Sequence, residues 1–230
     1  MPLVSVVIPV YNQAAYVGEA VQSALNQTLT DREVIVVNDG STDGTAAVLA
    51  GFGERIRVFH KPNGGTSSAL NLGISQATGR YVAWLSADDV FLPEKLHLQV
   101  NAMMHHPRAG LCYTDWYIID GAGCITGQSG SPTFAGREAV VGGLLQGCCI
   151  NGSTVLMLRS ALARVGPFNE AYRQAHDYDM WLRFALYYEF VHVARPLLKY
   201  RWHGANLSLQ ADALAYNAEI IAKARQMHGR

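Results

Sequence analysis

Two adjacent carboxylates, Asp88 and Asp89, directly follow an apolar run at residues 81–85 of the chain. Like charges side by side at the end of a buried segment are unfavourable unless a positive group lies beside them. Two further aspartates stand at comparable places, because Asp39 ends another apolar run and Asp177 opens an amphipathic segment. Carboxylates hold divalent cations and act as general bases, so these positions suit either kind of chemistry.

The elements that must position these carboxylates follow from the spacing of apolar residues. In the first half the pattern predicts strands at 3–10, before Asn38, at 56–60 and at 81–85, alternating with helices at 14–27, 43–52, 66–76 and 93–105. Strands and helices that alternate at this spacing form parallel sheets. After about residue 111 the pattern changes to strands within 111–127 and at 154–158 and 196–203, with helices at 136–145, 177–188 and 212–227. The predicted fold class is α/β, with a Rossmann-like, mostly parallel sheet flanked by helices and a mixed second half.

The size and charge of the chain narrow the classes of function. Its 230 residues suit a single large domain, and 18 basic residues balance 18 acidic ones, which gives no overall electrostatic footprint for nucleic acid. The N-terminus lacks a basic region and a small-residue cleavage site, and no apolar run reaches the roughly 18–20 residues that span a bilayer. We therefore expect a cytoplasmic protein with reduced cysteines, in solution or peripheral to the inner face of the membrane.

The ends of three predicted strands bring polar side chains to one edge of the sheet. Pro9 and Tyr11 end the first strand, Asp39 the second and Asp88 the fourth. Ligands of open parallel sheets bind outside these carboxyl ends. The chain has no GxGxxG after its first strand and no GxxxxGK[ST], so neither a dinucleotide site nor a P-loop is expected. A phosphate ligand would face carboxylates here and would need a bridging cation, for which Mg²⁺ or Mn²⁺ is suited.

Each of these signals also has a purely structural alternative. The Ala-Asp-Asp sequence at 87–89 is typical of a solvated turn or a helix cap as well. Asp39 is equally suited to an Asx-turn, and Tyr11 to the role of a strand-end aromatic. The coincidence of all three at one sheet edge favours a ligand site over three unrelated structural roles.

A resemblance to a known family is carried by four segments: VSVVIPVYN, EVIVVNDGSTDGT, NGGTSSALNLGISQATGRYVAWLSADD and HDYDMWLRFALYYEFVHVARPLLKYRWHGANLS. Together and in this order, from about Val4 to Ser208, they resemble the family 2 glycosyltransferases of the GT-A fold. The resemblance implies an inverting enzyme that uses a nucleotide-diphosphate sugar and a divalent cation, Mn²⁺ or Mg²⁺.

For the first half, the resemblance implies a nucleotide site at the sheet edge. Pro9 and Tyr11 would line the pocket of the base. Asp39 would accept a hydrogen bond from the base, which suits an ionised carboxylate because it only accepts. Lys61 and Asn63 lie on the loop that often contacts the nucleotide in the family.

The resemblance also assigns the metal. Asp88 matches the last carboxylate of the family's DXD motif, which binds the metal on the diphosphate. The first position of that motif is Ser86 in this chain, a departure that leaves one motif carboxylate instead of two. Ser86 is then expected to contact a ribose or a metal-bound water, and Asp89 to assist Asp88 or to cap a helix.

In the second half, Asp177 matches the catalytic acidic residue of the family. It follows His176 where the family usually has another acid. An aspartate there would take the proton of an acceptor hydroxyl, although an acidic residue also favours the positive end of a helix for structural reasons. Trp181 lies on the same helix face and is expected in the core rather than beneath a sugar. Arg183 is expected to reach a phosphate or to form an ordinary ion pair.

Two residues near the end of the last matching segment complete the candidate site. His203 matches a histidine of the family and is expected to hold the metal or donate to the pyrophosphate. The alternative is that His203 is an ordinary surface or core histidine that binds no ligand. Arg201 is a further candidate for balancing phosphate charge.

The expected function is the transfer of one sugar from a UDP-sugar to a hydroxyl of a carbohydrate or glycolipid acceptor, in surface polysaccharide or glycoconjugate synthesis. Residues 1–230 would form one domain, with a nucleotide-binding half at about 1–115 and an acceptor-side catalytic half at about 116–230. Two alternatives stay open: a catalytically silent sugar-nucleotide-binding module, favoured only by Ser86, and a nucleotidyltransferase. The Gly-rich loop with Arg and Lys that a nucleotidyltransferase usually carries after its first strand is absent from PVYNQAAYVGEA.

Overall fold

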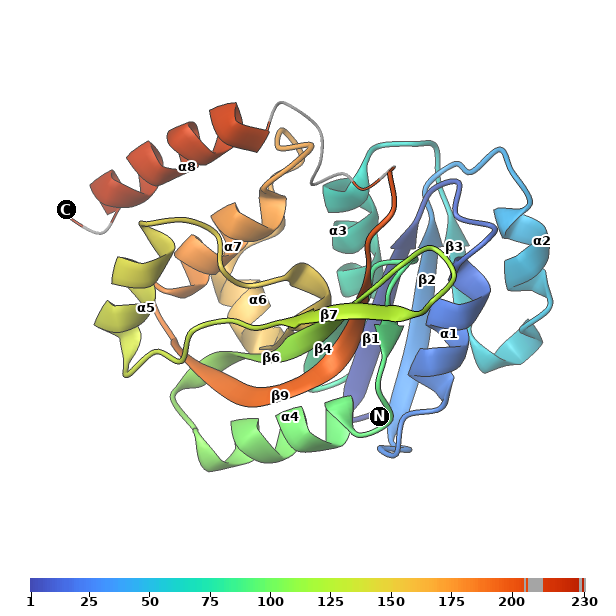
Figure 1. Cartoon of the computed structure of the whole chain (residues 1–230), viewed down its shortest axis with the longest axis horizontal. Helices are drawn as coiled ribbons and strands as arrows, with labels where there is room; N and C mark the ends of the chain where they lie inside the picture. The colour runs from blue at the N-terminus through green and yellow to red at the C-terminus, as the bar shows by residue number, and fades with distance from the viewer. Residues whose placement is uncertain (205, 207–212, 228, 230) are drawn as a thin grey trace.

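The structure is a computed structural model that describes residues 1–204, 206, 213–227 and 229 (Figure 1). Its first half contains β1 (Val4–Val10), α1 (Val17–Leu25), β2 (Arg32–Asn38), α2 (Thr45–Ala50), η1 (Gly53–Arg55), β3 (Arg57–His60), α3 (Thr66–Gln76), β4 (Tyr81–Trp84), β5 (Val90–Phe91) and α4 (Lys95–His105). The second half contains β6 (Ala109–Ile119), β7 (Ile125–Ser129), α5 (Arg137–Leu144), η2 (Gly152–Thr154), β8 (Leu156–Leu158), α6 (Arg159–Val165), α7 (His176–Phe184), β9 (Glu189–Arg201) and α8 (Ala213–Met227).

The strands in the described part of the chain form one sheet in the order β3-β2-β1-β4-β8-β6-β9-β5, with β7 beside β6. The neighbours β3, β2, β1 and β4 are all parallel, as the alternation of strands and helices predicts. Beyond β4 the sheet is mixed, because β8 runs antiparallel to both β4 and β6, whereas β6 and β9 are parallel. The predicted α/β class, with a parallel first half and a mixed second half, is confirmed.

Helices cover both faces of the sheet because its central strands are apolar on both sides. β1 is buried along its whole length, and its side chains alternate between two cores. Val6 and Ile8 belong to the core that includes side chains of α1, α2 and α4. Val7 belongs to the core shared by α3 and the helices α5 to α8. Figure 1 shows β1 to β3, α1 and α2 in blue and cyan on one side, the green α4 below β9, and α8 along the outer side of α7.

The observed boundaries differ from the predicted ones mainly in the second half. β9 begins at Glu189 rather than at residue 196, and the helix predicted to reach 188 ends at Phe184. Pro196 lies opposite Asp115 at an irregularity of the β6–β9 pairing, so it interrupts the apolar pattern in the middle of a strand. The predicted start of the last helix at Asp212 lies outside the described residues. No described helix has both the length and the apolar character needed to cross a membrane.

A lysine is buried at the start of α4. Lys95 Nζ donates to Gln99 Oε1 at 2.9 Å and lies 4.0 Å from the centre of the Phe91 ring. Gln99 Nε2 donates in turn to the carbonyl oxygens of Cys112 and Thr154. Burial lowers the pKa of Lys95 to about 7, because the charged ammonium loses its hydration in the core.

We predict that Lys95→Met stabilises the protein at pH 7 and flattens the dependence of its stability on pH. The folded pKa of about 7 lies below the ordinary value of 10.5, so between these values the unfolded state binds more protons. The free energy of unfolding of the wild type should therefore rise from pH 7 to pH 10, by up to about 4 kcal/mol. Urea unfolding at both pH values measures this, with Lys199→Met as a half-exposed control. A variant that retains the pH slope of the wild type would contradict the assignment.

Candidate active site

The turn after β4 is tied to the short helix η2. The Ser86 main-chain N–H donates to Ser153 Oγ at 3.0 Å, and the Ser153 hydroxyl lies 3.0 Å from Ser86 Oγ. Asn151 Oδ1 accepts from the Ser153 main-chain N–H at 2.9 Å, which fixes η2 at its start. Asp89 N–H donates to Ser86 O at 3.1 Å and closes the turn that presents Asp88.

Asp88 lies beside His203, a residue 115 positions later in the chain. Asp88 Oδ2 is 3.1 Å from His203 Nε2, and both side chains are mostly buried. The ring of Tyr16 stacks on His203 with centroids 5.4 Å apart. Asn206 Oδ1 accepts from the His203 main-chain N–H at 2.6 Å, which holds the backbone of His203 in place. The two predicted metal ligands are therefore adjacent.

Asp89 points away from this pair into the protein. Its side chain is buried, and Oδ1 accepts from the Arg201 main-chain N–H at 2.9 Å. Burial, together with repulsion from Asp88, raises the pKa of Asp89 well above its ordinary value. Asp89 thus anchors the end of β9, a role different from the helix cap or metal helper expected from the sequence.

Arg201 is a buried cation next to the paired carboxylates. Its guanidinium is buried and donates to four acceptors: the carbonyl oxygens of Asp88 at 2.8 Å, Asp120 at 3.1 Å and Gly121 at 3.2 Å, and the carboxylate of Glu19. Because these internal acceptors surround the guanidinium, its contacts favour a role in holding the Asp88 turn over the predicted role as a phosphate ligand.

Three residues predicted for the nucleotide lie together at the end of β2. The Asp39 carboxylate is buried and accepts from Lys61 Nζ at 2.5 Å and from the main-chain N–H groups of Gly64 and Gly65 at 3.0 and 2.8 Å. Asn63 Nδ2 donates to Asp39 O at 3.1 Å. The carboxylate therefore organises the loop 61–65, and a base N–H would reach it only by displacing one of these donors.

The strand β1 presents its end next to Asp39. Pro9 is paired with Val37 of β2, and Asp39 N–H donates to Val10 O at 2.9 Å. Tyr11 follows with 48% of its surface exposed, which leaves its ring open to a planar ligand. Gly40 adopts φ +77°, and a Cβ there would lie 2.7 Å from Asn63 N, so the loop 61–65 approaches the β2 end only because residue 40 is glycine.

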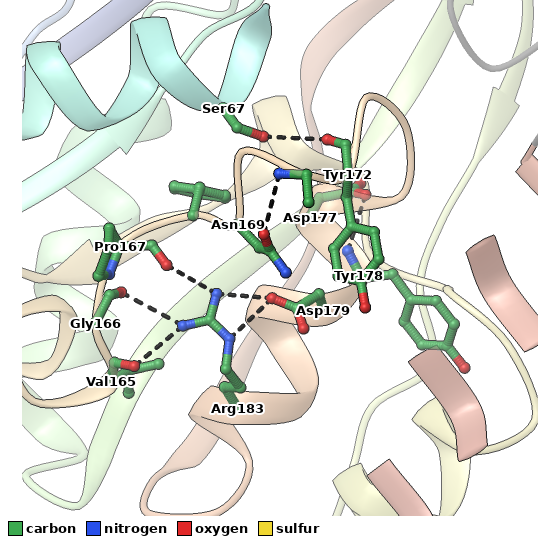
Figure 2. A network of polar contacts seen from close by, with 12 residues as sticks. Ser67, Val165, Gly166, Pro167, Asn169, Tyr172, Asp177, Tyr178, Asp179 and Arg183 are labelled. Atoms are coloured by element: carbon green, nitrogen blue, oxygen red, sulfur yellow. Dashed lines mark hydrogen bonds and ion pairs between the residues drawn. The ribbon is translucent and has the colours of Figure 1, made fainter. Parts of the chain in front are cut away.

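Asp177 lies in the first turn of α7, where the helix dipole favours a carboxylate (Figure 2). Its side chain is half-buried, and Oδ1 accepts from the Tyr178 main-chain N–H at 2.8 Å. The preceding Ala175 adopts a left-handed conformation with φ 55°, which is uncommon for a residue other than glycine.

Arg183 and Trp181 have structural contacts on the same helix. Arg183 forms an ion pair with Asp179, with Nη2 2.8 Å from Oδ2, and also donates to the carbonyl oxygens of Val165 and Pro167 at 3.0 Å (Figure 2). The ordinary ion pair, one of the two roles expected for Arg183, is the one observed. Trp181 is fully buried and its Nε1 donates to Ile150 O at 3.2 Å, in line with the expected core position.

The segment before Asp88 and the segment before Asp177 meet through two rings. Trp84, two residues before Ser86, lies 5.5 Å from the ring of His176, the residue before Asp177. Gly152 packs directly on Trp84, where a Cβ would lie 2.4 Å from the ring. Sequence reasoning did not find this contact, nor the roles of Tyr16 and Ser153, because their partners lie far away along the chain. Only the Asn-Gly-Ser-Thr sequence at 151–154 carries a local signal, that of a side-chain-capped turn.

Residues 5–166 match the family model described as glycosyl transferase family 2. The chain belongs to glycosyl transferase family 2. It is 38% identical over 212 residues to an uncharacterised glycosyltransferase of Rickettsia typhi, covering 89% of this chain and 65% of that protein. It is 34% identical over 214 residues to the chondroitin synthase of Pasteurella multocida, covering 91% of this chain and 22% of that one.

Solved structures show the same fold. TarS of S. aureus in complex with UDP-GlcNAc superposes with a TM-score of 0.78 at 18% identity, covering 97% of this family 2 chain and 66% of TarS 1–349. The mannosyltransferase PcManGT of Pyrobaculum calidifontis, solved with GDP-Man and Mn²⁺, gives a TM-score of 0.71 at 20% identity over 98% of this chain and 64% of that one. The fold is therefore GT-A, as the resemblance implied. The chain spans 65% of the length of the Rickettsia typhi relative and less of the synthases.

We predict that Arg201→Lys destabilises the protein by about 2–4 kcal/mol, because a lysine cannot reach several carbonyl oxygens at once and leaves buried acceptors unpaired. Urea unfolding measures the loss. The control is Arg195→Lys, since Arg195 forms an exposed ion pair with Glu94 at 3.1 Å and should change stability by less than about 0.5 kcal/mol. Equal effects of the two substitutions would show that Arg201 does not hold the turn.

Proposed function

We propose that this chain is an inverting glycosyltransferase that moves one sugar from a nucleotide-diphosphate donor to an acceptor hydroxyl. The observation that carries the proposal is the pairing of Asp88 with His203 at 3.1 Å, joined through the Trp84–His176 contact to the turn that bears Asp177. This arrangement supplies a place for a diphosphate and a general base within one site.

Asp88 and His203 together form a pair of ligands that fits a divalent cation. They offer one carboxylate oxygen and one imidazole nitrogen, a donor set that suits Mn²⁺ or Mg²⁺. Among the described residues no cluster of three or more His, Cys, Asp or Glu side chains is arranged to hold a metal. A cation would thus take its remaining ligands from diphosphate and water, as Mg²⁺ commonly does. It would supply positive charge to the leaving diphosphate.

The chain's own residues account for the remaining steps. Tyr11 offers an exposed ring for the base, and the loop organised by Asp39 borders it. Asp88 and His203 orient the diphosphate end of the donor. Asp177 takes the proton of the acceptor hydroxyl as that oxygen attacks the anomeric carbon from the face opposite the diphosphate, which inverts the configuration.

A UDP-sugar is the favoured donor. TarS was solved with UDP and with UDP-GlcNAc, and the relatives include chondroitin and hyaluronan synthases, whereas PcManGT was solved with GDP-Man. We propose a carbohydrate or glycolipid acceptor and a role in surface polysaccharide or glycoconjugate synthesis, in the cytoplasm or at the inner face of the membrane. UDP-GlcNAc is the first donor to test, followed by other UDP- and GDP-sugars.

We predict that Asp177→Asn lowers kcat for donor turnover by roughly 10²–10⁴-fold, because an amide cannot accept the proton. Release of UDP from UDP-GlcNAc in the presence of Mn²⁺ measures turnover, and calorimetry measures UDP affinity, which should not change. Asp179→Asn is the matched control, since Asp179 pairs with Arg183 and should affect stability more than kcat. Full activity in Asp177→Asn would exclude Asp177 as the base.

We predict that Asp88→Asn weakens the binding of UDP in Mn²⁺ by about tenfold or more and leaves metal-free binding of UDP unchanged, because the substitution removes one charged ligand. Calorimetric titration with and without EDTA measures both affinities. The same loss of UDP affinity in EDTA as in Mn²⁺ would indicate that Asp88 supports the fold of the site and not a cation.

A further inference from the structure

His176 is a buried histidine whose ring nitrogens have no hydrogen-bond partner. The residue is 7% exposed, and its ring lies against Trp84 and Phe168, with centroid distances of 5.5 and 6.1 Å. Neither Nδ1 nor Nε2 has a hydrogen-bond partner among the described residues, and the same holds for Nε1 of Trp84. Buried polar groups are nearly always paired, so two such rings in contact call for an explanation.

The two unpaired groups are complementary. An indole N–H only donates, whereas a neutral imidazole always has one nitrogen that accepts. Burial lowers the pKa of His176, against the opposing effect of Asp177 and Asp179, which keeps the ring neutral near pH 7. A movement of the first turn of α7 that brings the acceptor nitrogen of His176 to the Trp84 indole N–H would pair both groups at once.

The turn that would move is already strained. Ala175, directly before His176, has φ 55°, and it and Asn12 are the residues other than glycine with positive φ in the described part of the chain. Strain and unpaired buried groups cost folding free energy, and they persist mainly where a site uses them. The strained turn leads directly into Asp177, whereas Trp84 leads into Ser86 and Asp88 on the opposite side of the site.

We propose that His176 is a positioning residue for Asp177. When the nucleotide sugar binds, the first turn of α7 shifts, the Trp84 Nε1–H donates to His176, and this bond fixes the base relative to the diphosphate site. The inference rests on the proposed function, in which Asp177 is the base. In the free protein the same imidazole lowers stability, because its ring nitrogens are buried without a hydrogen-bond partner.

The test compares two buried histidines. In His192, which is also stacked on an aromatic ring, Nδ1 lies 2.6 Å from Thr133 Oγ1 and Nε2 lies 2.9 Å from Asp115 Oδ1. We expect His176→Phe to raise Tm by about 2–6 °C, because it removes unpaired polar atoms, and His192→Phe to lower Tm by a similar amount. A fall in Tm for His176→Phe would show that the ring already has a partner and would overturn the inference.

Kinetics separate positioning from a purely structural role. We expect His176→Phe to lower kcat for UDP-GlcNAc by roughly 3- to 10-fold without changing UDP affinity, and His176→Gln, which keeps an acceptor, to recover most of the loss. Trp84→Phe combined with His176→Phe should lose no more kcat than the more impaired single variant, because both remove the same bond. Wild-type kcat in His176→Phe, or additive losses in the double variant, would contradict the inference.

The bond itself has a spectroscopic signature. In ¹⁵N-labelled protein the indole signal of Trp84, assigned through its loss in Trp84→Phe, should move downfield and exchange more slowly when UDP-GlcNAc and Mg²⁺ are added. An unchanged signal at saturating ligand would overturn the inference. Failure of the proposed function looks different, since the wild type would then turn over no nucleotide sugar at all.

Discussion

The buried guanidinium of Arg201 is the interaction on which the site depends. Arg201 holds the main chain beside the two adjacent carboxylates, because its guanidinium donates to Asp88 O and its main-chain N–H donates to Asp89 Oδ1, while its charge pairs with the carboxylate of Glu19. Because His203 follows Arg201 by two residues, these contacts also bring the His203 imidazole to Asp88. The buried guanidinium of Arg201 thereby fixes the positions of both proposed metal ligands. The side chains of Asp88 and His203 then remain available to the substrate.

Local patterns predicted the first half of the fold and the sheet edge at which three candidate site residues lie. Fully apolar runs alternating with amphipathic helices lead to one topology, which places Pro9, Asp39 and Asp88 at the same sheet edge whatever their exact contacts. The helix predicted at 66–76 has these bounds in the structure. The prediction was weaker wherever a contact joins distant segments. Arg201 was expected to balance phosphate charge, because nothing near it in the sequence reveals the carbonyl oxygens of Asp88 and Asp120 as its partners.

The second half was harder to predict because its elements break the simple periods. Pro196 in the middle of β9 made one strand look like a loop followed by a shorter strand, and α6 is too short to show a helical period clearly. The alternatives left open for Arg183 and Trp181 were decided by packing, which puts the first in an ion pair and the second in the core. Asp39 was predicted to bind the nucleotide base. In the structure its carboxylate accepts from Lys61, Gly64 and Gly65 of its own loop.

The long parallel pairing of β6 with β9 also sets an order of events during synthesis. β6 ends at Ile119 and its neighbour β9 is complete only at Arg201, so about eighty residues must leave the ribosome before the two strands can register. Until then Arg201 cannot contact the turn at Asp88, and the sheet of the first half has an edge whose partner strands have not yet formed. A nascent chain can therefore form the parallel pairs of β1 to β4 before the turn at Asp88 gains its contacts with β9.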